Sequence, residues 1–373
     1  MEIAPVKSNR DLDEFINLPF SLHAASDLWV PPIRSQETRL LTPGKHPFWE
    51  SARRELFLLR KDGHAIGRIA AIVDDKYNNY ANEKCGSFGF FECVNDPAGA
   101  YALLNAAYEW LRSENMAFMR GPLNPSANYT CGMLVNGFDQ APALMMPWNP
   151  PYYPVLLETW PMRKEEDLFA YVIDRENMKL ANWLTEEAGR IKNERRFTCR
   201  PATKKTLESD IHAMLEIYQQ AWAKNWGFSP LSKAEANEHV KELKGILDPD
   251  FFVLFFDGEK PIAGMVALPD MNPLLKRLHG RIGLLAPWHL WRCSKETRRG
   301  MRIMLYGILP EYRLHGLPLL LLDYMLNKAV TRPGLKWVEG SWVLESNPAM
   351  NELMEDFSGR LAKRYRIYRR EIL

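Results

Sequence analysis

The sequence predicts an α/β protein made of two tandem copies of one fold, each a mixed, mostly antiparallel sheet flanked by helices. The chain has 373 residues, and domains of about 100–200 residues are usual. Three landmarks return after 195, 197 and 198 residues. They are Asp-Gly turns (Gly63 and Gly258), the glycines that follow them (Gly67 and Gly264) and Asn-Pro pairs (Asn149 and Asn347). Besides the chain length and these repeated landmarks, both halves share one order of expected strands and helices.

The Asp-Gly turns each follow an apolar run, Leu56–Leu59 in one half and Phe251–Phe256 in the other. Asp-Gly between strand-like runs is typical of a β-hairpin. Because this dipeptide is frequent in hairpins, its chance recurrence is the alternative to a true repeat.

Both halves follow the order β-α-α-β-β-β-α-β-α-β. We expect a first domain over 1–173, a helical linker over 174–196 and a second domain over 197–373. Besides the hairpin, the first half is expected to contain Ile3–Val6, Asn9–Leu18, Ser87–Val94, Pro97–Arg112, Ala117–Arg120, a short helix after Asn149 and a strand at Leu168–Ile173. The second is expected to contain Phe197–Arg200, Leu207–Lys224, Ser232–Leu247, Arg302–Leu309, Leu317–Val330, Lys336–Leu344, a helix after Asn347 and a strand at Tyr365–Tyr368.

The composition narrows the class of protein. A net charge of +2 gives no overall attraction to nucleic acid, so DNA is not an expected partner. The five cysteines form no C-x-x-C pair and the histidines show no ligand spacing, so we expect reduced thiols and no metal site. No secretory signal and no apolar run of about 20 residues is present, so a cytoplasmic protein is predicted, at most peripheral to a membrane.

Two insertions interrupt the repeat. Residues 121–148 are rich in Gly, Pro and Asn, and loops this long are usually functional or disordered. Residues 271–300 mix Leu and Trp with seven Lys or Arg residues. A basic surface edged by Trp is typical of interfacial segments, which makes a peripheral membrane contact one interpretation. A folded cover over the protein's own core is the other.

The stretch from Arg302 to Val330 reads as strand, tight turn and helix. Its turn directs backbone N–H groups outward at a helix start, where the helix dipole also favours an anion. Gly316 lets the chain approach that anion closely, and Pro318 suits the first helical turn. Arg313 and His315 can add positive charge or hydrogen bonds. An ordinary glycine-containing turn is the alternative.

The segment Arg313-Leu314-His315-Gly316-Leu317-Pro318 resembles the coenzyme A pyrophosphate loop of the GCN5-related N-acetyltransferases, Gln/Arg-x-x-Gly-x-Gly/Ala. Two of its three landmark positions match, and Pro318, which has no N–H, replaces the last small residue. Residues 337–368 resemble the same family's fifth strand, fourth helix and last strand. The resemblance is close over 196–373 and looser over 1–173.

The resemblance implies that acyl-coenzyme A is the donor substrate, held by the loop residues Arg313, Leu314, His315, Gly316 and Leu317, with Asn347 nearby. Asn347 is equally explained as a plain helix N-cap. The matching turn of the first half, 95–99, lacks the pattern, and its Asp96 would repel phosphate. We therefore expect the first copy to be degenerate.

Catalysis in this family is implied to be attack of an amine on a thioester, with a carboxylate base and a donor for the leaving thiolate. Glu339 and Glu345 are the candidate bases and Tyr306 the candidate donor, while a solvated carboxylate or a packed sheet tyrosine is the ordinary alternative. The family's tyrosine would fall near Leu353 or Met354, where none is present.

The predicted function is acyl-coenzyme A-dependent N-acylation of an amine. The Trp, Met and Leu content of the two insertions suggests a bulky or lipid-like acceptor. Two alternatives remain: a non-catalytic acyl-coenzyme A-binding or sensing protein, and an aminoacyl-tRNA-dependent transferase of the paired type. The near-neutral charge argues against an RNA partner.

Overall fold

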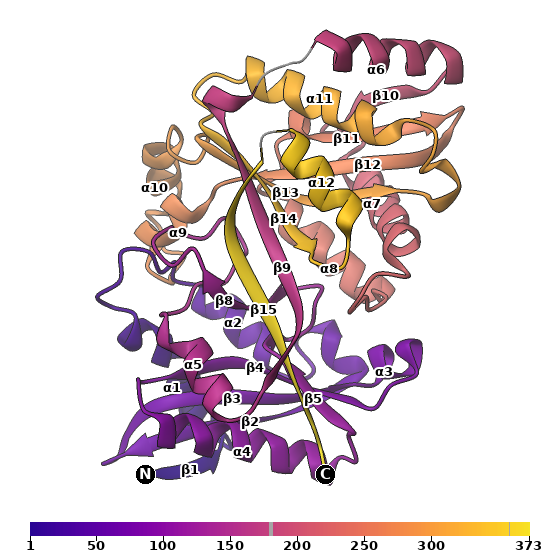
Figure 1. Ribbon diagram of the computed structural model, residues 1–373. Coiled ribbons are helices and arrows are strands. Elements are labelled where there is room, and N and C mark those ends of the chain that lie inside the picture. Colours follow the sequence, from indigo (N-terminus) through magenta and orange to yellow (C-terminus); the bar gives the residue numbers. More distant parts are fainter. Residues whose placement is uncertain (179–181, 358) are drawn as a thin grey trace.

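A computed structural model describes residues 1–178, 182–357 and 359–373 and places two sheet-and-helix halves one above the other (Figure 1). The first half has strands β1 (Glu2–Pro5), β2 (Ala52–Lys61), β3 (His64–Asp74), β4 (Cys85–Cys93), β5 (Phe118–Gly121), β6 (Leu123–Asn124), β7 (Thr130–Cys131), β8 (Met133–Asn136) and β9 (Arg163–Asp174). Its helices are α1 (Asn9–Leu22), α2 (Arg34–Leu41), α3 (Asp75–Ala81), α4 (Pro97–Ser113) and α5 (Tyr152–Thr159).

The second half follows helix α6 (Asn182–Arg195), which lies in the predicted linker. Its strands are β10 (Thr198–Pro201), β11 (Phe252–Asp257), β12 (Lys260–Pro269), β13 (Gly300–Ile308), β14 (Trp337–Leu344) and β15 (Arg360–Glu371). Its helices are α7 (Leu207–Trp222), α8 (Lys233–Lys244), α9 (Asn272–Leu278), α10 (Ala286–Cys293), α11 (Leu317–Thr331) and α12 (Pro348–Asp356). The predicted fold class, two tandem copies of a mixed, mostly antiparallel sheet with helices, is confirmed.

The predicted hairpins form at β2–β3 and β11–β12. Gly63 and Gly258 sit in the turns with φ of +80° and +59°, a region that glycine enters without steric cost. On α7 apolar side chains at spacings of three and four are buried at Ile211, Leu215 and Tyr218, and Ile211 and Leu215 belong to the core of the second half. The local sequence pattern therefore predicts the two hairpins and helix α7 correctly.

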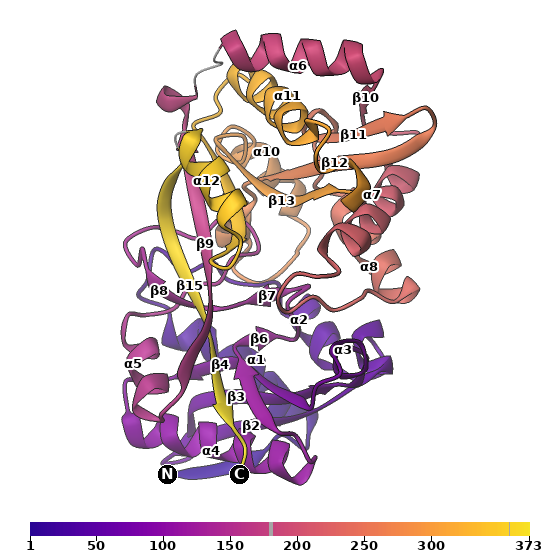
Figure 2. The same cartoon turned by 45° about the vertical axis from the view of Figure 1, so that its right-hand side comes forward.

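The last strand of each half crosses into the other half, which no sequence pattern indicated. The sheet runs β1-β2-β3-β4-β5-β15-β9-β14-β13-β12-β11-β10, so β15 extends the first half and β9 extends the second. The two long strands lie side by side through the middle of the molecule (Figures 1 and 2). Arg366 of β15 is paired directly across from Asp167 of β9, with 2.9 Å between Nε and Oδ1.

The two copies each contain one parallel strand pair, and both pairs are short. In the first half β4 and β5 pair only over Cys85–Ser87. In the second half β13 pairs with β14 over Gly300–Ile303, although β13 continues to Ile308. Beyond Ile303 the two strands diverge, which leaves a gap in the sheet of the second half.

Candidate active site

A pocket of about 650 Å³ occupies the gap between β13 and β14. Helices α11 and α12 and the end of α7 enclose it, and Ile173 of the exchanged strand β9 contributes to its wall. Its volume lies in the range of small-molecule sites. The lining is mainly apolar and includes Met265, Ile303, Met304, Leu322, Met325, Leu326, Leu353, Met354 and Phe357.

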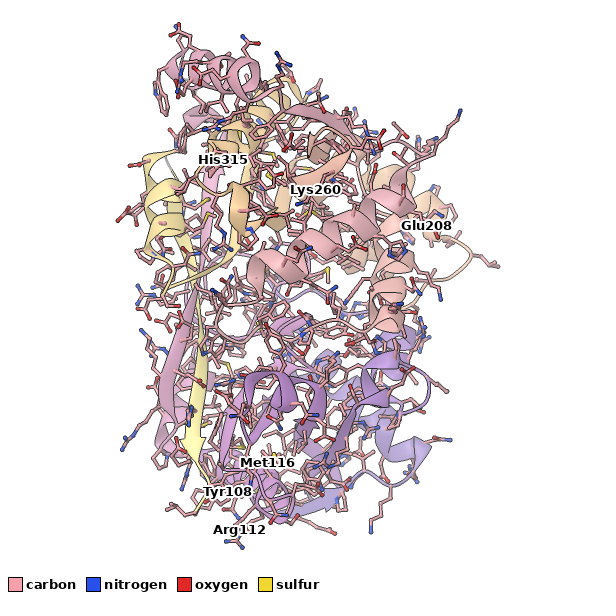
Figure 3. All side chains as sticks on the ribbon, turned by 90° about the vertical axis from the view of Figure 1, so that its right-hand side faces the viewer. Tyr108, Arg112, Met116, Glu208, Lys260 and His315 are labelled. Carbon is pink, nitrogen blue, oxygen red and sulfur yellow. The ribbon has the colours of Figure 1, made fainter. Side chains whose placement is uncertain are left out.

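The turn between β13 and α11 lies at one end of this pocket, with Arg313 and Pro318 in the lining. Figure 3 shows His315 of this turn in the half of the molecule away from Tyr108 and Arg112 of α4. Leu314 is 95 % exposed. Within the described residues, the backbone N–H groups of Gly316 and Leu317 make no hydrogen bond. Leu317 is fully buried, so of these two N–H groups only that of the partly exposed Gly316 is open to a ligand.

Gly316 is required at this turn for two separate reasons. Its φ is +76°, in the left-handed region that favours glycine. A Cβ there would also come within 2.5 Å of Cδ1 of Ile191 in α6. The tight turn before α11 therefore depends on this one residue, as the sequence motif indicated.

A chain of buried polar groups forms the floor of the pocket. The Ser341 hydroxyl donates to Oε1 of Glu339 at 2.9 Å and accepts from Nε of Arg302 at 3.0 Å. Arg302 and Glu339 are 3 % and 1 % exposed, and Ser341 is among the residues that line the pocket. These hydrogen bonds thus link Ser341 in the pocket wall to the Glu339 carboxylate, which water does not reach directly.

Further charges surround Glu339. Nζ of Lys363, on β15, lies 3.7 Å from Oε2 of Glu339, and both side chains are buried. Burial raises the pKa of Asp270 to about 6, and the nearby Glu339 carboxylate adds to the effect, while the Asn272 N–H and two lysines oppose it. Burial of paired charges is costly unless hydrogen bonds satisfy them, so this cluster is more typical of a functional site than of a stabilising one.

Tyr306, on β13, lines the same pocket. Its phenol oxygen is buried and has no hydrogen-bond partner in the described part of the chain. Burial raises the pKa of Tyr306, so the phenol stays protonated and available as a donor.

The remaining predicted residues are divided between pocket and surface. Asn347 lines the pocket, and its Oδ1 accepts from the Met350 N–H at 3.3 Å, capping α12. Glu345 is half-exposed, lies outside the lining and pairs with Lys164 at 2.5 Å. Of the predicted residues, Tyr306, Asn347 and Arg313 line the pocket, and Glu339 reaches it only through its hydrogen bond with Ser341. The other predicted residues lie outside the lining; they are Leu314, His315, Gly316, Leu317 and Glu345.

The corresponding turn of the first half already uses its own N–H groups. Oδ1 of Asp96 accepts from the N–H groups of Ala98 and Gly99 at 3.0 and 3.4 Å. The carboxylate that caps α4 thus takes donors that a phosphate would need.

The gap beside β4 is closed by the protein itself. Oδ1 of Asn124, in the 121–148 insertion, accepts from the Phe90 N–H at 2.6 Å. The backbone passes so close that a Cβ on Gly89 would lie 1.8 Å from the Leu123 carbonyl oxygen. The first copy therefore has a filled gap where the second has a pocket.

The two insertions meet beneath the floor. Nδ2 of Asn272 donates to the Pro142 carbonyl at 2.7 Å, and Arg302 donates to the Leu144 carbonyl at 2.8 Å. Among the described lining residues of the pocket none comes from either insertion. The insertions support the polar floor from outside and do not form the apolar wall.

Ser341 and Arg302 are the site residues that no sequence motif had predicted. Ser341 stands two residues after Glu339 on one strand, and that period places both side chains on one face. This signal was present in the sequence. The position of Arg302 opposite Glu339 depends on the register of two parallel strands, which no local pattern encodes.

Comparisons with known proteins support the fold and the class of activity. No protein-family model matches the chain. It is 31 % identical over 387 aligned residues to the bacterial ceramide synthase of Caulobacter vibrioides, covering 100 % of this chain and 98 % of that protein. It is 29 % identical over 374 residues to the protein YghO of Escherichia coli, covering 98 % and 94 % of the two chains.

Solved structures share the fold at low sequence identity. A tandem GCN5-related N-acetyltransferase from the clavulanic acid biosynthesis pathway superposes with a TM-score of 0.55 at 11 % identity, covering 100 % of this chain and 98 % of that one. A family member from Sphaerobacter thermophilus gives a TM-score of 0.52 at 14 % identity, with 99 % and 96 % covered.

The chain has the tandem fold of the GCN5-related N-acetyltransferases. Within that class, the chain belongs to the family of the bacterial ceramide synthase of Caulobacter vibrioides.

Proposed function

We propose that the protein transfers an acyl group from acyl-coenzyme A to the primary amine of a long-chain amino alcohol, forming a ceramide-like amide. The observation that carries this proposal is the apolar pocket in the β13–β14 gap, which has Arg313 at one end and Ser341, hydrogen-bonded to Glu339, in its wall. The full-length relationship to a bacterial ceramide synthase supports a lipid amine as the acceptor.

The donor is placed with its pyrophosphate at the turn 313–317. The unpaired N–H of Gly316 and the N-terminus of α11 favour an anion there. Pro318 supplies no N–H. Arg313 lies at the pocket edge and adds positive charge, while its Nη2 donates to the Ala221 carbonyl. The pantetheine arm and acyl chain then extend along the apolar lining.

In the reaction the amine nitrogen attacks the thioester carbonyl carbon and the C–S bond breaks. The amine proton passes to the Ser341 oxygen as the hydroxyl proton moves to Glu339, which is already its acceptor at 2.9 Å. Arg302, donating to Ser341, fixes the hydroxyl for this relay. Tyr306 donates its proton to the departing thiolate, because its phenol has no competing partner among the described residues.

The test is turnover with defined substrates. Purified protein is incubated with palmitoyl-coenzyme A and a long-chain amino alcohol such as sphinganine, and free thiol and the amide product are measured by absorbance and mass spectrometry. We expect equal amounts of thiol and amide, and little product when a short hydrophilic amine such as ethanolamine replaces the lipid. Thiol release without amide, or a preference for the short amine, contradicts the assignment.

A further inference from the structure

We propose that residues 281–299, with α10 at their centre, form a surface that docks the protein on an anionic lipid bilayer. This surface is called the α10 patch. This role goes beyond the proposed acyl transfer, because binding to a bilayer is a separate property that can be measured without turnover.

Exposed apolar side chains gather in the α10 patch. Of the fourteen large hydrophobic side chains that are exposed among the described residues, six lie within ten positions of the sequence. They are Ile282, Leu284, Leu285, Trp288, Leu290 and Trp291. Leu284 is fully exposed and Trp291 is 74 % exposed. Single exposed apolar residues are normal on a soluble surface, but a contiguous group marks a contact with another apolar phase or partner.

Positive charge surrounds the same side chains. The segment 271–300 contains seven Lys or Arg residues and one acidic residue, a net charge of +6 in a chain whose total is +2. Arg281, Arg292, Lys295, Arg298 and Arg299 are exposed. The Arg292 guanidinium lies 4.9 Å from the Trp288 ring centre, so a cation and an indole share one edge of α10. Basic residues beside Trp and Leu fit the headgroup region of an anionic leaflet.

The α10 patch is held rigidly, with α9 facing the protein and α10 facing outward. Lys276 donates to the Asp27 carbonyl, and Arg34 donates to the His279 carbonyl at 2.8 Å, which anchors α9 to the first half. Cys293 at the end of α10 is fully buried. Figure 1 shows α10 projecting from the side of the molecule next to α9. A fixed apolar helix face that no part of the described chain covers is suited to an external surface.

The α10 patch leads directly into the candidate site. Arg302, which positions Ser341 on the pocket wall, stands nine positions after Cys293. Asn272, at the start of α9, contacts the loop that carries Leu144, a second partner of Arg302. A bilayer bound at α10 therefore lies next to the structural elements that hold the pocket floor.

A bilayer fits this composition better than a nucleic acid does. Phosphate backbones are bound through cations and planar stacking groups, to which exposed aliphatic side chains contribute nothing. Ile282, Leu284 and Leu285 gain free energy only when they enter an apolar phase. The combination of these aliphatic side chains with the cations favours the lipid surface.

The experiment is vesicle flotation of the full chain. Vesicles are either pure phosphatidylcholine or phosphatidylcholine with phosphatidylglycerol, at low and at high salt. We expect flotation with the anionic vesicles that weakens at high salt. The variant Trp288→Ala/Trp291→Ala and the variant Lys295→Glu/Arg298→Glu should each reduce the partition coefficient by about tenfold or more. The matched controls are Tyr101→Ala/Val155→Ala, which removes exposed apolar groups elsewhere, and Lys204→Glu/Lys205→Glu, which changes the net charge equally.

Unchanged flotation of the two patch variants, or an equal loss in the controls, overturns the proposal. A wild-type dimer that the double tryptophan variant converts to monomer would instead assign the α10 patch to self-association. Loss of transfer RNA binding in a mobility-shift assay, with vesicle binding absent, would assign it to nucleic acid. Bilayer binding without amide formation would count against the proposed function only, and acylation of a micellar amine without bilayer binding would count against this proposal only.

Discussion

The two halves share one fold, yet within the described residues the gap beside the parallel strands is filled in the first half and open in the second. In the first half Asp96 occupies the helix-start donors and Asn124 fills the place beside Phe90. In the second half no described group accepts from the Gly316 N–H of the corresponding turn, and a pocket lies between β13 and β14. A few atoms, and not the fold, decide whether the gap beside the parallel strands is filled or open.

The comparison extends to the paired strands themselves. Ser87 of β4 lies opposite Arg120 of β5, at the register position where Arg302 lies opposite Glu339 in the second half. Arg120 forms a two-point pair with Glu165 of the exchanged strand β9, at 2.5 and 2.8 Å. The same position therefore carries an ion pair to the exchanged strand β9 in the first copy and a buried carboxylate behind the pocket wall in the second.

The largest expected effect is a loss of turnover when Glu339 or its partner Ser341 is replaced. Glu339→Gln should lower turnover by about a thousandfold and Ser341→Ala by about a hundredfold, because general-base contributions reach this size. Binding of coenzyme A should stay within about twofold, since neither side chain belongs to the turn 313–317. Glu345→Gln is the matched control and should leave turnover unchanged, because Glu345 pairs with Lys164 outside the pocket. Equal losses in Glu345→Gln and Glu339→Gln would remove the assigned relay.

The filled gap of the first half predicts a structural penalty. Gly89→Ala places a Cβ 1.8 Å from the Leu123 carbonyl oxygen, so we expect a loss of about 3 kcal/mol in the free energy of unfolding. Chemical denaturation measures it. Gly189→Ala is the control, because no more distant part of the described chain lies within 4 Å of its added Cβ. If Gly89→Ala folds with wild-type stability, the first copy is not closed as described.

The charged floor of the second half predicts a pH dependence. The folded pKa of Asp270 is about 6, above its ordinary value of 3.8, so the protonated form favours folding and stability falls as pH rises between these values. Asp270→Asn retains the acceptor for the Asn272 N–H and removes the ionisation. It should exceed the wild type by about 2 kcal/mol at pH 7 and equal it near pH 4. Parallel denaturation curves at the two pH values, with no difference between proteins, would contradict this environment.

A smaller effect on coenzyme A binding should distinguish the turn before α11 from the turn before α4. Leu314→Asp adds a carboxylate to the exposed loop of the second half, and we expect about tenfold weaker coenzyme A binding by calorimetry, from charge repulsion at a distance of a few ångströms. Leu314→Asn controls for size. Ala98→Asp adds the same charge to the first-half turn and should have no effect. Sensitivity to Ala98→Asp instead would move the donor to the first copy.

Sequence patterns predicted what depends on near neighbours. The Asp-Gly hairpins, the helix α7 and the turn at Gly316 all depend on residues within a few positions, and all three are present as expected. The sequence indicated Glu339 as a candidate base. Its burial could not be predicted, because that burial depends on Lys363 and on the exchanged strands.

Contacts between distant segments could not be predicted from the sequence. The exchange of β9 and β15 pairs residues about 200 positions apart, such as Asp167 with Arg366, and nothing local distinguishes it from pairing within each half. The closure at Phe90 likewise depends on one amide oxygen from a loop without a period. Such features arise from the assembled sheet alone.

The most direct test of the central claim is a crystal structure with a non-hydrolysable acyl-coenzyme A analogue. We expect one molecule per chain, with its pyrophosphate at the N–H group of Gly316, its acyl chain in the β13–β14 pocket and Asn124 still bonded to Phe90. A pyrophosphate at the Asp96 turn, or an acyl chain between β4 and β5, would contradict it.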